Sequence, residues 1–170
     1  MWYVLQVRSG TEENIKRQCE KNIPNGILEQ CFIPYYEEQR HVRGEWITLK
    51  KVQFPGYLFV VTEELEQLYR DLKSVIGFTK LIGTGKEVAA LTEEEILLLQ
   101  RLGGDEHVAV MSEGIIEQSQ VKVISGPLAG MEGCIRRIDR HKRRAWLEVD
   151  MFGRKQLIQA GIEIVAKNYY

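Results

Sequence analysis

The feature that most constrains the fold is a series of short apolar segments in the last third of the chain. They recur at regular intervals, and turn-forming residues separate them. Segments of this length and spacing are typical of strands in a small β-barrel. The expected strands lie at 119–125, 131–138, 144–150, 154–158 and 162–166. A barrel of about 52 residues is near the lower size limit for an independent core, which closure of the sheet makes attainable.

The first 106 residues follow another pattern, in which helix and strand signals alternate. Apolar residues at helical spacing predict helices at 12–22 and 65–75, and a Thr92–Glu95 capping box predicts a third helix from about 93. Strand signals lie at 2–7, 28–36, 47–54, 55–61 and 77–83. The order β-α-β-β-β-α-β-α is typical of a ferredoxin-like α/β sandwich, with helices on one face of an antiparallel sheet. The predicted class is therefore α+β, with this sandwich at 1–106, a linker at 107–118 and the barrel at 119–170.

The two predicted domains differ in charge. The chain as a whole has a formal charge of −1. Residues 1–106 contain 13 Lys and Arg against 17 Asp and Glu, a charge of −4, whereas residues 107–170 contain 10 against 7, a charge of +3. Six of the nine residues at 136–144, the basic segment, are Lys or Arg. Such asymmetry suggests that the two domains meet different partners.

Several classes of protein do not fit the sequence. No apolar run approaches the roughly 18–20 residues of a membrane span. Gln6 and Arg8 interrupt the first apolar stretch, which disfavours a signal peptide, so we expect a cytoplasmic protein. The cysteines are odd in number and widely spaced, which disfavours a disulfide framework or a zinc site; they are Cys19, Cys31 and Cys134.

We also find no pattern typical of an enzyme. The segment GTGKE at 83–87 lacks the spacing of a phosphate-binding P-loop. The three histidines share no metal-like spacing with the cysteines, and no nucleophile elbow is present. We therefore expect no catalytic residue, no metal and no cofactor.

The most specific pattern is VKVISGPLAGMEGCI at 121–135. Its valines alternate into a core, Gly-Pro marks a tight turn, and spaced glycines permit backbone conformations that other residues resist. The stretch resembles the KOW motif, which occurs in small SH3-like barrels of transcription and translation proteins. A generic glycine-rich hairpin is the alternative. The residues that carry the resemblance are Val121, Val123, Gly126, Pro127, Gly130 and Gly133.

A second resemblance lies in the amino-terminal half. The stretches WYVLQVRSGTEENIKRQCE, FPGYLFV and GFTKLIGTGKEV, the last followed by LTEEE, are similar in order and spacing to the amino-terminal (NGN) domain of the NusG family. Together with the KOW motif, the resemblance covers essentially the whole chain. It implies a monomeric transcription factor without enzymatic activity. Within the family, the strongly basic KOW domain is most similar to LoaP, a specialised antitermination branch.

The resemblance implies that the NGN domain docks an apolar sheet surface onto the clamp helices of the largest RNA polymerase subunit. Aromatic side chains with a polar tip suit such an interface, although simple core packing is the alternative for Phe54 and Tyr57. The residues implied are Trp2, Phe54, Pro55, Gly56, Tyr57 and Phe59. A hairpin around 37–51 occupies the place of a variable family loop, where it could contact DNA or remain a solvated loop. Its basic residues are Arg40, His41, Arg43, Lys50 and Lys51.

The basic segment spans the end of one barrel strand, a turn and the start of the next. Clustered Lys and Arg neutralise phosphates, and the planar Arg fork can also read guanine edges. We expect RNA as the partner, with a structured hairpin of the nascent transcript as the favoured target. A solvated turn or an acidic protein partner remains open. The expected RNA-binding residues are Lys122, Arg136, Arg137, Arg140, His141, Lys142, Arg143 and Arg144.

The favoured function is a processive antitermination or elongation factor. A housekeeping NusG that couples polymerase to Rho or the ribosome is the first alternative, and a ribosome-associated KOW protein is the second. Many relatives carry aromatic residues after Gly-Pro for contacts with Rho and a ribosomal protein. This chain has Leu128, Ala129 and Met131 there, although the FGR segment at 152–154 remains, so the resemblance to coupling factors is weaker at this loop.

Overall fold

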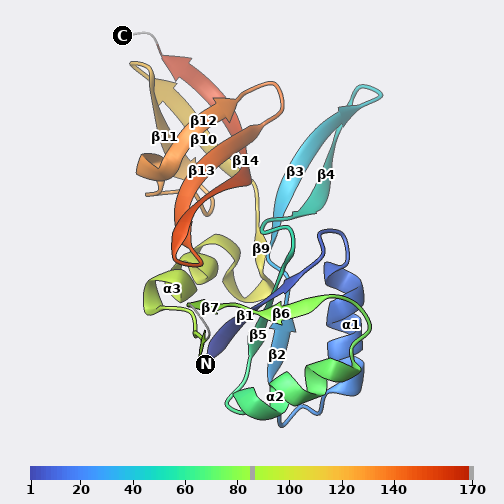
Figure 1. Ribbon diagram of the computed structural model, residues 1–170. Helices are drawn as coiled ribbons and strands as arrows, with labels where there is room; N and C mark the ends of the chain where they lie inside the picture. Colours follow the sequence, from blue (N-terminus) through green and yellow to red (C-terminus); the bar gives the residue numbers. More distant parts are fainter. Residues whose placement is uncertain (85–86, 169–170) are drawn as a thin grey trace. The chain divides into compact units, whose positions relative to one another are not determined.

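The computed structural model describes residues 1–84 and 87–168, and the chain divides into two compact units (Figure 1). The first unit comprises 1–33 and 54–96, and the second comprises 34–53 and 97–170. Within the described ranges, no helix is long and apolar enough to cross a membrane. The predicted α+β class is confirmed, while the domain boundaries remain a prediction.

The first unit is built on an antiparallel sheet in the order β2-β5-β1-β6, with helices α1 and α2 on one side of it (Figure 1). The strands are β1 (Trp2–Val7), β2 (Gln30–Phe32), β5 (Tyr57–Val61) and β6 (Thr79–Leu81). The helices are α1 (Glu12–Asn22) and α2 (Leu65–Asp71), and a 3-10 turn at Leu72–Ser74 continues α2. A short pair, β7 (Gly83–Thr84) and β8 (Glu87–Val88), follows β6. The predicted helix at 12–22 is confirmed at both ends.

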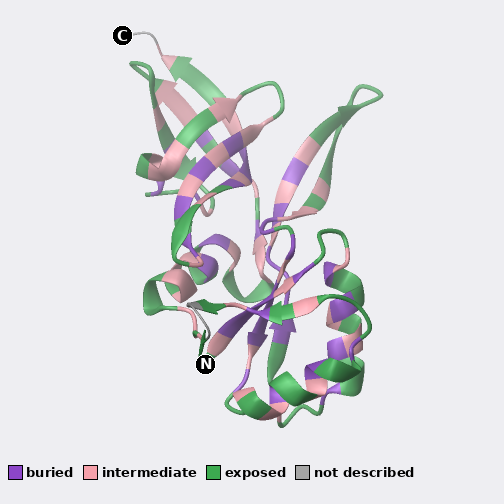
Figure 2. Cartoon of the chain, viewed as in Figure 1, coloured by how far each residue is buried: buried purple, intermediate pink, exposed green. Residues whose placement is uncertain are grey.

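The core of the first unit lies between the sheet and α1. Leu5 and Leu58 are fully buried, and Ile15 and Cys19 present one face of the helix to them at a spacing of four residues. Figure 2 shows buried residues along the central strands of this sheet. A hydrogen bond with Cys19, together with burial, raises the pKa of the Cys31 thiol, so it stays neutral at physiological pH. All three cysteines are free thiols.

The second unit contains a five-stranded sheet in the order β11-β10-β14-β13-β12. Its strands are β10 (Ser112–Glu117), β11 (Gln120–Ser125), β12 (Ile135–Asp139), β13 (Arg144–Met151) and β14 (Arg154–Asn168). A 3-10 turn at Glu132–Cys134 precedes β12. Fully buried side chains, among them Leu128, Leu147 and Met151, fill the barrel.

Helix α3 (Glu93–Gly103) begins in the first unit and ends in the second, and a 3-10 turn at Gly104–Glu106 follows it. The predicted capping box is confirmed. The Thr92 backbone N–H donates to Glu95 Oε1 at 2.9 Å, and the Glu95 N–H donates to Thr92 Oγ1 at 3.2 Å.

The β3–β4 hairpin, formed by β3 (Tyr35–Val42) and β4 (Glu45–Val52), belongs to the second unit. It forms a sheet with β9 (Val108–Ala109), which pairs parallel to β3. The predicted turn lies at Arg43 and Gly44, whose φ angles of 50° and 81° are those of a tight two-residue hairpin turn. The predicted strand at 28–36 is broken, because Ile33 and Pro34 separate β2 from β3.

The structure differs from the predicted barrel in two places, and the second difference has a steric cause. Strand β10 lies inside the predicted linker, where it pairs with both β11 and β14. The two strands predicted at 154–158 and 162–166 form one continuous strand, β14. Gly161, which resembles a turn residue in the sequence, is a close-approach position: a Cβ there would lie 2.5 Å from the carbonyl oxygen of Glu37 and 2.2 Å from Met111 Sδ. Glycine at this position allows another backbone close to the strand without ending it.

A buried carboxylate holds the FPGY turn of the first unit. Glu12 is 4% exposed, and its carboxylate accepts the backbone N–H of Gly56 at 3.1 Å and that of Gly10 at 2.9 and 3.0 Å. The Val7 N–H donates to the Gly56 carbonyl at 2.9 Å, and Gly56 has a φ of +87°. The start of α1 therefore fixes the turn that precedes Tyr57.

Replacement of Glu12 by Ala should destabilise the first unit, because the buried N–H of Gly56 and the part-buried N–H of Gly10 lose their acceptor. An unsatisfied buried donor costs about 1–3 kcal/mol. Urea denaturation should show a loss of about that size or more for Glu12→Ala. The matched control is Glu12→Gln, which keeps one acceptor oxygen and should lose less. Equal stability of the Ala variant and the unsubstituted chain would contradict this role.

Candidate functional site

Strand pairing places the predicted polymerase-binding aromatics on one face of the first-unit sheet. Tyr57 lies opposite Gln6, and Trp2 lies opposite Val61, so both point to the same side. The contact of Cys31 with Cys19 of α1 identifies the other side as the helix-covered face. We call the face away from α1 the aromatic face; its members are Trp2, Phe32, Tyr57 and Phe59.

The rings on the aromatic face are packed in series. The centroids of Trp2 and Phe32 are 5.4 Å apart, edge to face, and those of Phe32 and Phe59 are 5.4 Å apart, stacked. Phe54 packs edge to face on Phe59 at 5.8 Å. Phe59 is fully buried and Phe54 is 3% exposed, so both belong to the core in this structure. Of the predicted residues, Trp2 and Tyr57 are half-buried and Pro55 is exposed, whereas Gly56 is buried.

The basic segment divides into two groups. Arg136, Arg137, Arg140, His141 and Lys142 are exposed and form what we call the outer set. Arg143 and Arg144 are half-buried and form the inner pair. The outer set lies on β12 and in the following turn. Of the inner pair, Arg143 ends this turn and Arg144 begins β13.

Members of the outer set on β12 contact their neighbours on β13. The guanidinium of Arg137 lies 4.8 Å from the ring centroid of Trp146, a cation–π distance. Arg136 Nε lies 3.4 Å from Glu148 Oε2, and its Nη1 donates to the Gly133 carbonyl at 2.7 Å. An exposed ion pair of this kind contributes at most about 1 kcal/mol and is readily exchanged for another anion.

The inner pair contacts the β3–β4 hairpin. Arg144 Nη2 pairs with Glu38, and Arg144 Nη1 donates to Gln159 Oε1 at 3.1 Å. Arg143 Nη1 donates to Gln39 Oε1 at 2.9 Å, and its guanidinium lies 3.8 Å from the ring centroid of Trp46. These partners were not predicted from the sequence. The signal that could have revealed them is the alternation of Tyr36 and Glu38 on one face of a strand, which places a carboxylate among buried positions.

A side-chain cap orders the basic turn. The Lys142 backbone N–H donates to Asp139 Oδ1 at 3.0 Å, and Arg143 adopts a left-handed φ of 51°. The hydrogen bond from the Lys142 N–H and the positive charge of Lys142 hold the pKa of Asp139 below its usual value. The turn thus projects Arg140, His141 and Lys142 into solvent around an ionised carboxylate.

The KOW-like residues shape the barrel. Val123 is buried, and Val121 is half-buried. Gly126 and Gly130 have φ angles of +97° and +80°, and a Cβ on Gly126 would lie 2.5 Å from Ser112 Cα, so glycine is required there. Pro127 follows Gly126 and is half-buried, whereas Gly133 has open space around its Cα.

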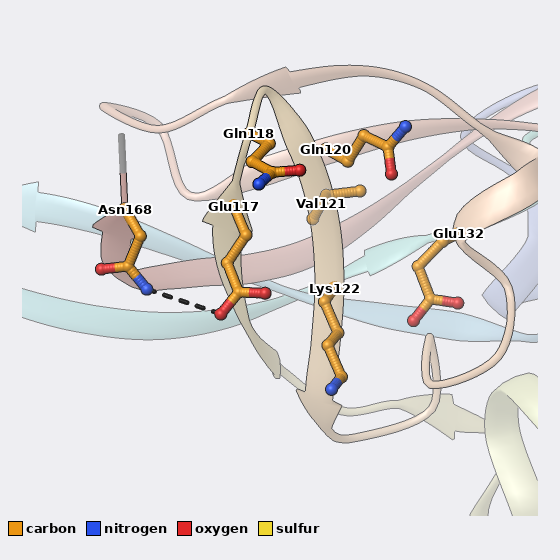
Figure 3. A pocket seen from close by; sticks show the side chains of 7 residues that line it. All are labelled: Glu117, Gln118, Gln120, Val121, Lys122, Glu132 and Asn168. Atoms are coloured by element: carbon orange, nitrogen blue, oxygen red, sulfur yellow. Dashed lines mark hydrogen bonds between the residues drawn. The ribbon is translucent and has the colours of Figure 1, made fainter. Parts of the chain in front are cut away.

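Lys122 lies on β11, whereas the basic segment begins on β12. Lys122 lines a polar groove of about 710 Å³ between the β10–β11 turn and Glu132 (Figure 3). The backbone N–H groups of Glu132 itself and of Val123 hold the pKa of the Glu132 carboxyl below its usual value. The groove is therefore lined by two carboxylates, those of Glu117 and Glu132, and by one ammonium group, that of Lys122. The groove therefore does not concentrate positive charge.

Comparison with known proteins gives consistent matches along the chain. A family model described as "Transcription termination factor nusG" matches residues 1–100. The transcription termination/antitermination protein NusG of Bacillus subtilis (strain 168) is 33% identical over 166 residues, which cover 93% of this chain and 93% of that protein. The chain belongs to the NusG family.

Further relatives agree. NusG of Staphylococcus aureus (strain Mu50 / ATCC 700699) is 31% identical over 174 aligned positions, covering 98% of this chain and 94% of the relative. A solved structure described as "Domain interaction in Thermotoga maritima NusG" has a TM-score of 0.61 and 24% identity, and covers 96% of this chain and 93% of that chain, which supports a NusG-like fold. Homologous NusG proteins are transcription factors and not enzymes, in agreement with the sequence. No group of three or more potential metal ligands occurs among the residues described.

The Asp139 cap should be visible in an acid titration of the Lys142 amide proton. The folded pKa of Asp139 lies below the unfolded value of about 3.9, so the cap is complete above that value and is lost as pH falls through the lower folded pKa. NMR should therefore give a titration midpoint below about 3.9 for this amide. Asp139→Asn, which cannot ionise, should abolish the transition. A midpoint at or above the ordinary value would exclude the cap.

Proposed function

We propose that this NusG-family protein is a transcription elongation and antitermination factor that binds RNA polymerase through the aromatic face and RNA through the outer set. The observation that carries the proposal is the presence of two chemically different accessible surfaces on separate units. One offers half-buried aromatic side chains, and the other offers exposed cations. A cytoplasmic location follows from a role in bacterial transcription.

Support for polymerase binding comes from the shape of the aromatic face. Trp2 and Tyr57 are partly accessible, and the Trp2 ring packs on the buried Phe32 ring, which in turn stacks on Phe59. Interface hot spots are enriched in Trp and Tyr that emerge from a well-packed surround. The family resemblance directs this face to the clamp helices of the largest polymerase subunit. Phe54, Gly56 and Phe59 then act by shaping the surface, with Pro55 at its edge.

Support for RNA binding comes from the exposure and position of the outer set. Arg140, His141 and Lys142 lie in one ordered turn, and Arg137 stacks near Trp146 at the end of β12. Guanidinium and ammonium groups on a turn can follow phosphates, and an Arg beside an indole can also contact an unpaired base. A structured hairpin of the nascent transcript is the favoured target. His41 and Arg43 of the hairpin are exposed and available to DNA or RNA, whereas Arg40, although exposed, pairs with Glu38.

The housekeeping alternative is a NusG whose barrel couples polymerase to Rho or the ribosome. The printed names of the relatives, termination and antitermination proteins, are compatible with it. The loop after Gly-Pro is less favourable, because Leu128 is fully buried and Met131 is 4% exposed, so neither provides an accessible anchor. A ribosome-associated role without polymerase predicts no polymerase binding at all.

Tyr57→Ala should weaken binding of the full chain to core RNA polymerase. Truncation of an aromatic hot spot costs about 2 kcal/mol, which corresponds to a roughly 30-fold higher Kd. A pull-down or biolayer measurement with purified core enzyme gives the comparison. The matched control is Tyr69→Ala on α2, a tyrosine that is 58% exposed and lies outside the aromatic face, which should bind as the unsubstituted chain does. Equal affinity of the Tyr57 and Tyr69 variants would remove the aromatic face from the interface.

RNA binding should depend steeply on salt. If four side chains neutralise phosphates, log K should fall with log salt at a slope of about −3, or on the order of 10²-fold between 50 and 200 mM. Arg140→Glu with Lys142→Glu should abolish the binding seen in a gel shift and leave polymerase binding unchanged.

The charge-matched control for this experiment is Arg154→Glu with Lys155→Glu, on β14 of the same barrel, which should retain RNA affinity. Equal losses in the two double variants would mean that net charge, and not the basic turn, attracts the RNA. Retained affinity in the Arg140 and Lys142 variant would leave the basic turn a solvated loop.

A further inference from the structure

We propose that Arg143 and Arg144 are positioning residues that clasp the β3–β4 hairpin to the barrel, and that this hairpin, and not RNA, is their partner. The clasp deepens the proposed function, since it divides the basic segment into residues for the chain itself and residues for the transcript. Two experiments test the clasp. The experiment on RNA binding rests on the proposed function, whereas the experiment on stability does not. All the residues concerned lie in the second unit.

The first support is steric. Gly161 lies in the middle of β14, opposite Arg144 of β13, and has an extended backbone that any residue could adopt. Glycine is needed because the backbone of β3 approaches at this point, where a Cβ would come within 2.5 Å of the Glu37 carbonyl oxygen. Glycine at position 161 therefore indicates that the surface of β14 is shaped to accept the hairpin.

The second support is electrostatic. Glu38 is 4% exposed, although it lies on a hairpin whose other strand, β4, is largely solvated. A buried carboxylate is tolerated when opposite charge and hydrogen bonds compensate it. Arg144 pairs with one carboxylate oxygen and Arg40 Nε lies 3.3 Å from the other. Arg144 is thus committed to an internal anion.

The third support is the set of partners of Arg143. Its guanidinium donates to Gln39, lies 3.3 Å from Glu163 Oε1 and covers one face of the Trp46 ring at 3.8 Å. Arg143 thus uses the N–H groups of its guanidinium for the carboxylate and the amide, and the planar face of the guanidinium for the indole. Two of these contacts, with Gln39 and Trp46, are with the hairpin, so a phosphate that took their place would separate Arg143 from it.

Further polar contacts join β3 to the barrel and to the segment before β10; we call this set of contacts the seam. The Tyr36 hydroxyl donates to Gln159 Oε1 at 3.3 Å, Gln53 Nε2 donates to the Gln159 carbonyl at 3.2 Å, and the Met111 N–H donates to Glu37 Oε1 at 2.8 Å. The seam places Arg40 and His41 of the hairpin directly after Gln39, which Arg143 binds. The clasp therefore holds the residue that directly precedes the basic end of the hairpin.

The experiment on stability is a double-mutant cycle on the full chain, without RNA. Glu38→Gln and Arg144→Gln should each lower the urea midpoint, and the double variant should fall no further than the worse single variant. Lys142→Gln, the charge-matched control in the adjacent turn, should leave the midpoint unchanged. In a Gly161→Ala background, which keeps every charge, the coupling between Glu38 and Arg144 should disappear. Additive single losses would overturn the clasp.

The experiment on RNA binding uses the salt dependence of binding to a stem-loop of about 16 base pairs, with a single strand of the same composition as comparison. Lys142→Gln should reduce the slope of log K against log salt by about 0.7–0.9, the value for one lost phosphate contact. Arg143→Gln and Arg144→Gln, which remove the same charge, should leave the slope unchanged. A reduction of that size in either arginine variant would overturn the assignment.

The two failures are distinguishable. If the unsubstituted chain binds neither RNA, the proposed transcript recognition is wrong, and the cycle between Glu38 and Arg144 still decides the clasp. If RNA binds but the coupling is absent, the clasp is wrong and the proposed function stands.

Discussion

The burial of the Glu38 carboxylate is the constraint on which the second unit depends. A charge removed from water must be compensated, and loss of one partner of such a pair typically costs about 3–5 kcal/mol. Here compensation comes from Arg144 on the barrel and Arg40 on the hairpin. In the proposed clasp, the hairpin cannot leave the barrel without exposing the Glu38 carboxylate, so this pairing helps to set the orientation of the hairpin.

The first unit uses a buried carboxylate differently. Glu12 binds backbone N–H groups and not cations, and it thereby fixes the turn at Gly56. The turn sets the start of β5, and strand pairing then places Tyr57 and Trp2 on one face. Local capping in one unit and side-chain pairing in the other thus prepare two surfaces of opposite character. An apolar surface suits a protein partner, and a cationic surface suits a polyanion.

Much of the fold could be predicted because its signals are local. The capping box at Thr92, the helix at 12–22 and the hairpin turn near Gly44 all depend on neighbours in the sequence. The errors share a different origin. The sequence pattern predicts a turn between 158 and 162, but the glycine at 161 is needed for the approach of Glu37, which is remote in sequence. Strand β10 has a weak sequence signal, because pairing with a strand on each side tolerates its polar residues.

The candidate site shows the same limit. Composition was sufficient to locate the basic segment, and alternation was sufficient to group Tyr57 with Phe59. A count of charges does not distinguish Arg143 and Arg144 from Arg140. The difference is that the first two contact the β3–β4 hairpin, whereas Arg140 is exposed to solvent. Burial of Phe54 and Phe59 likewise depends on tertiary packing that a motif does not encode.

The central claim is that the basic segment has two functions, and NMR of the arginine side chains in the full chain tests it most directly. The Nε–H signals of the arginines would be followed while a stem-loop RNA is added. The account predicts that the signals of Arg137 and Arg140 shift with RNA while those of Arg143 and Arg144 stay in place. Joint movement of all four signals would contradict it, since it would mean that the inner pair exchanges the hairpin for the transcript.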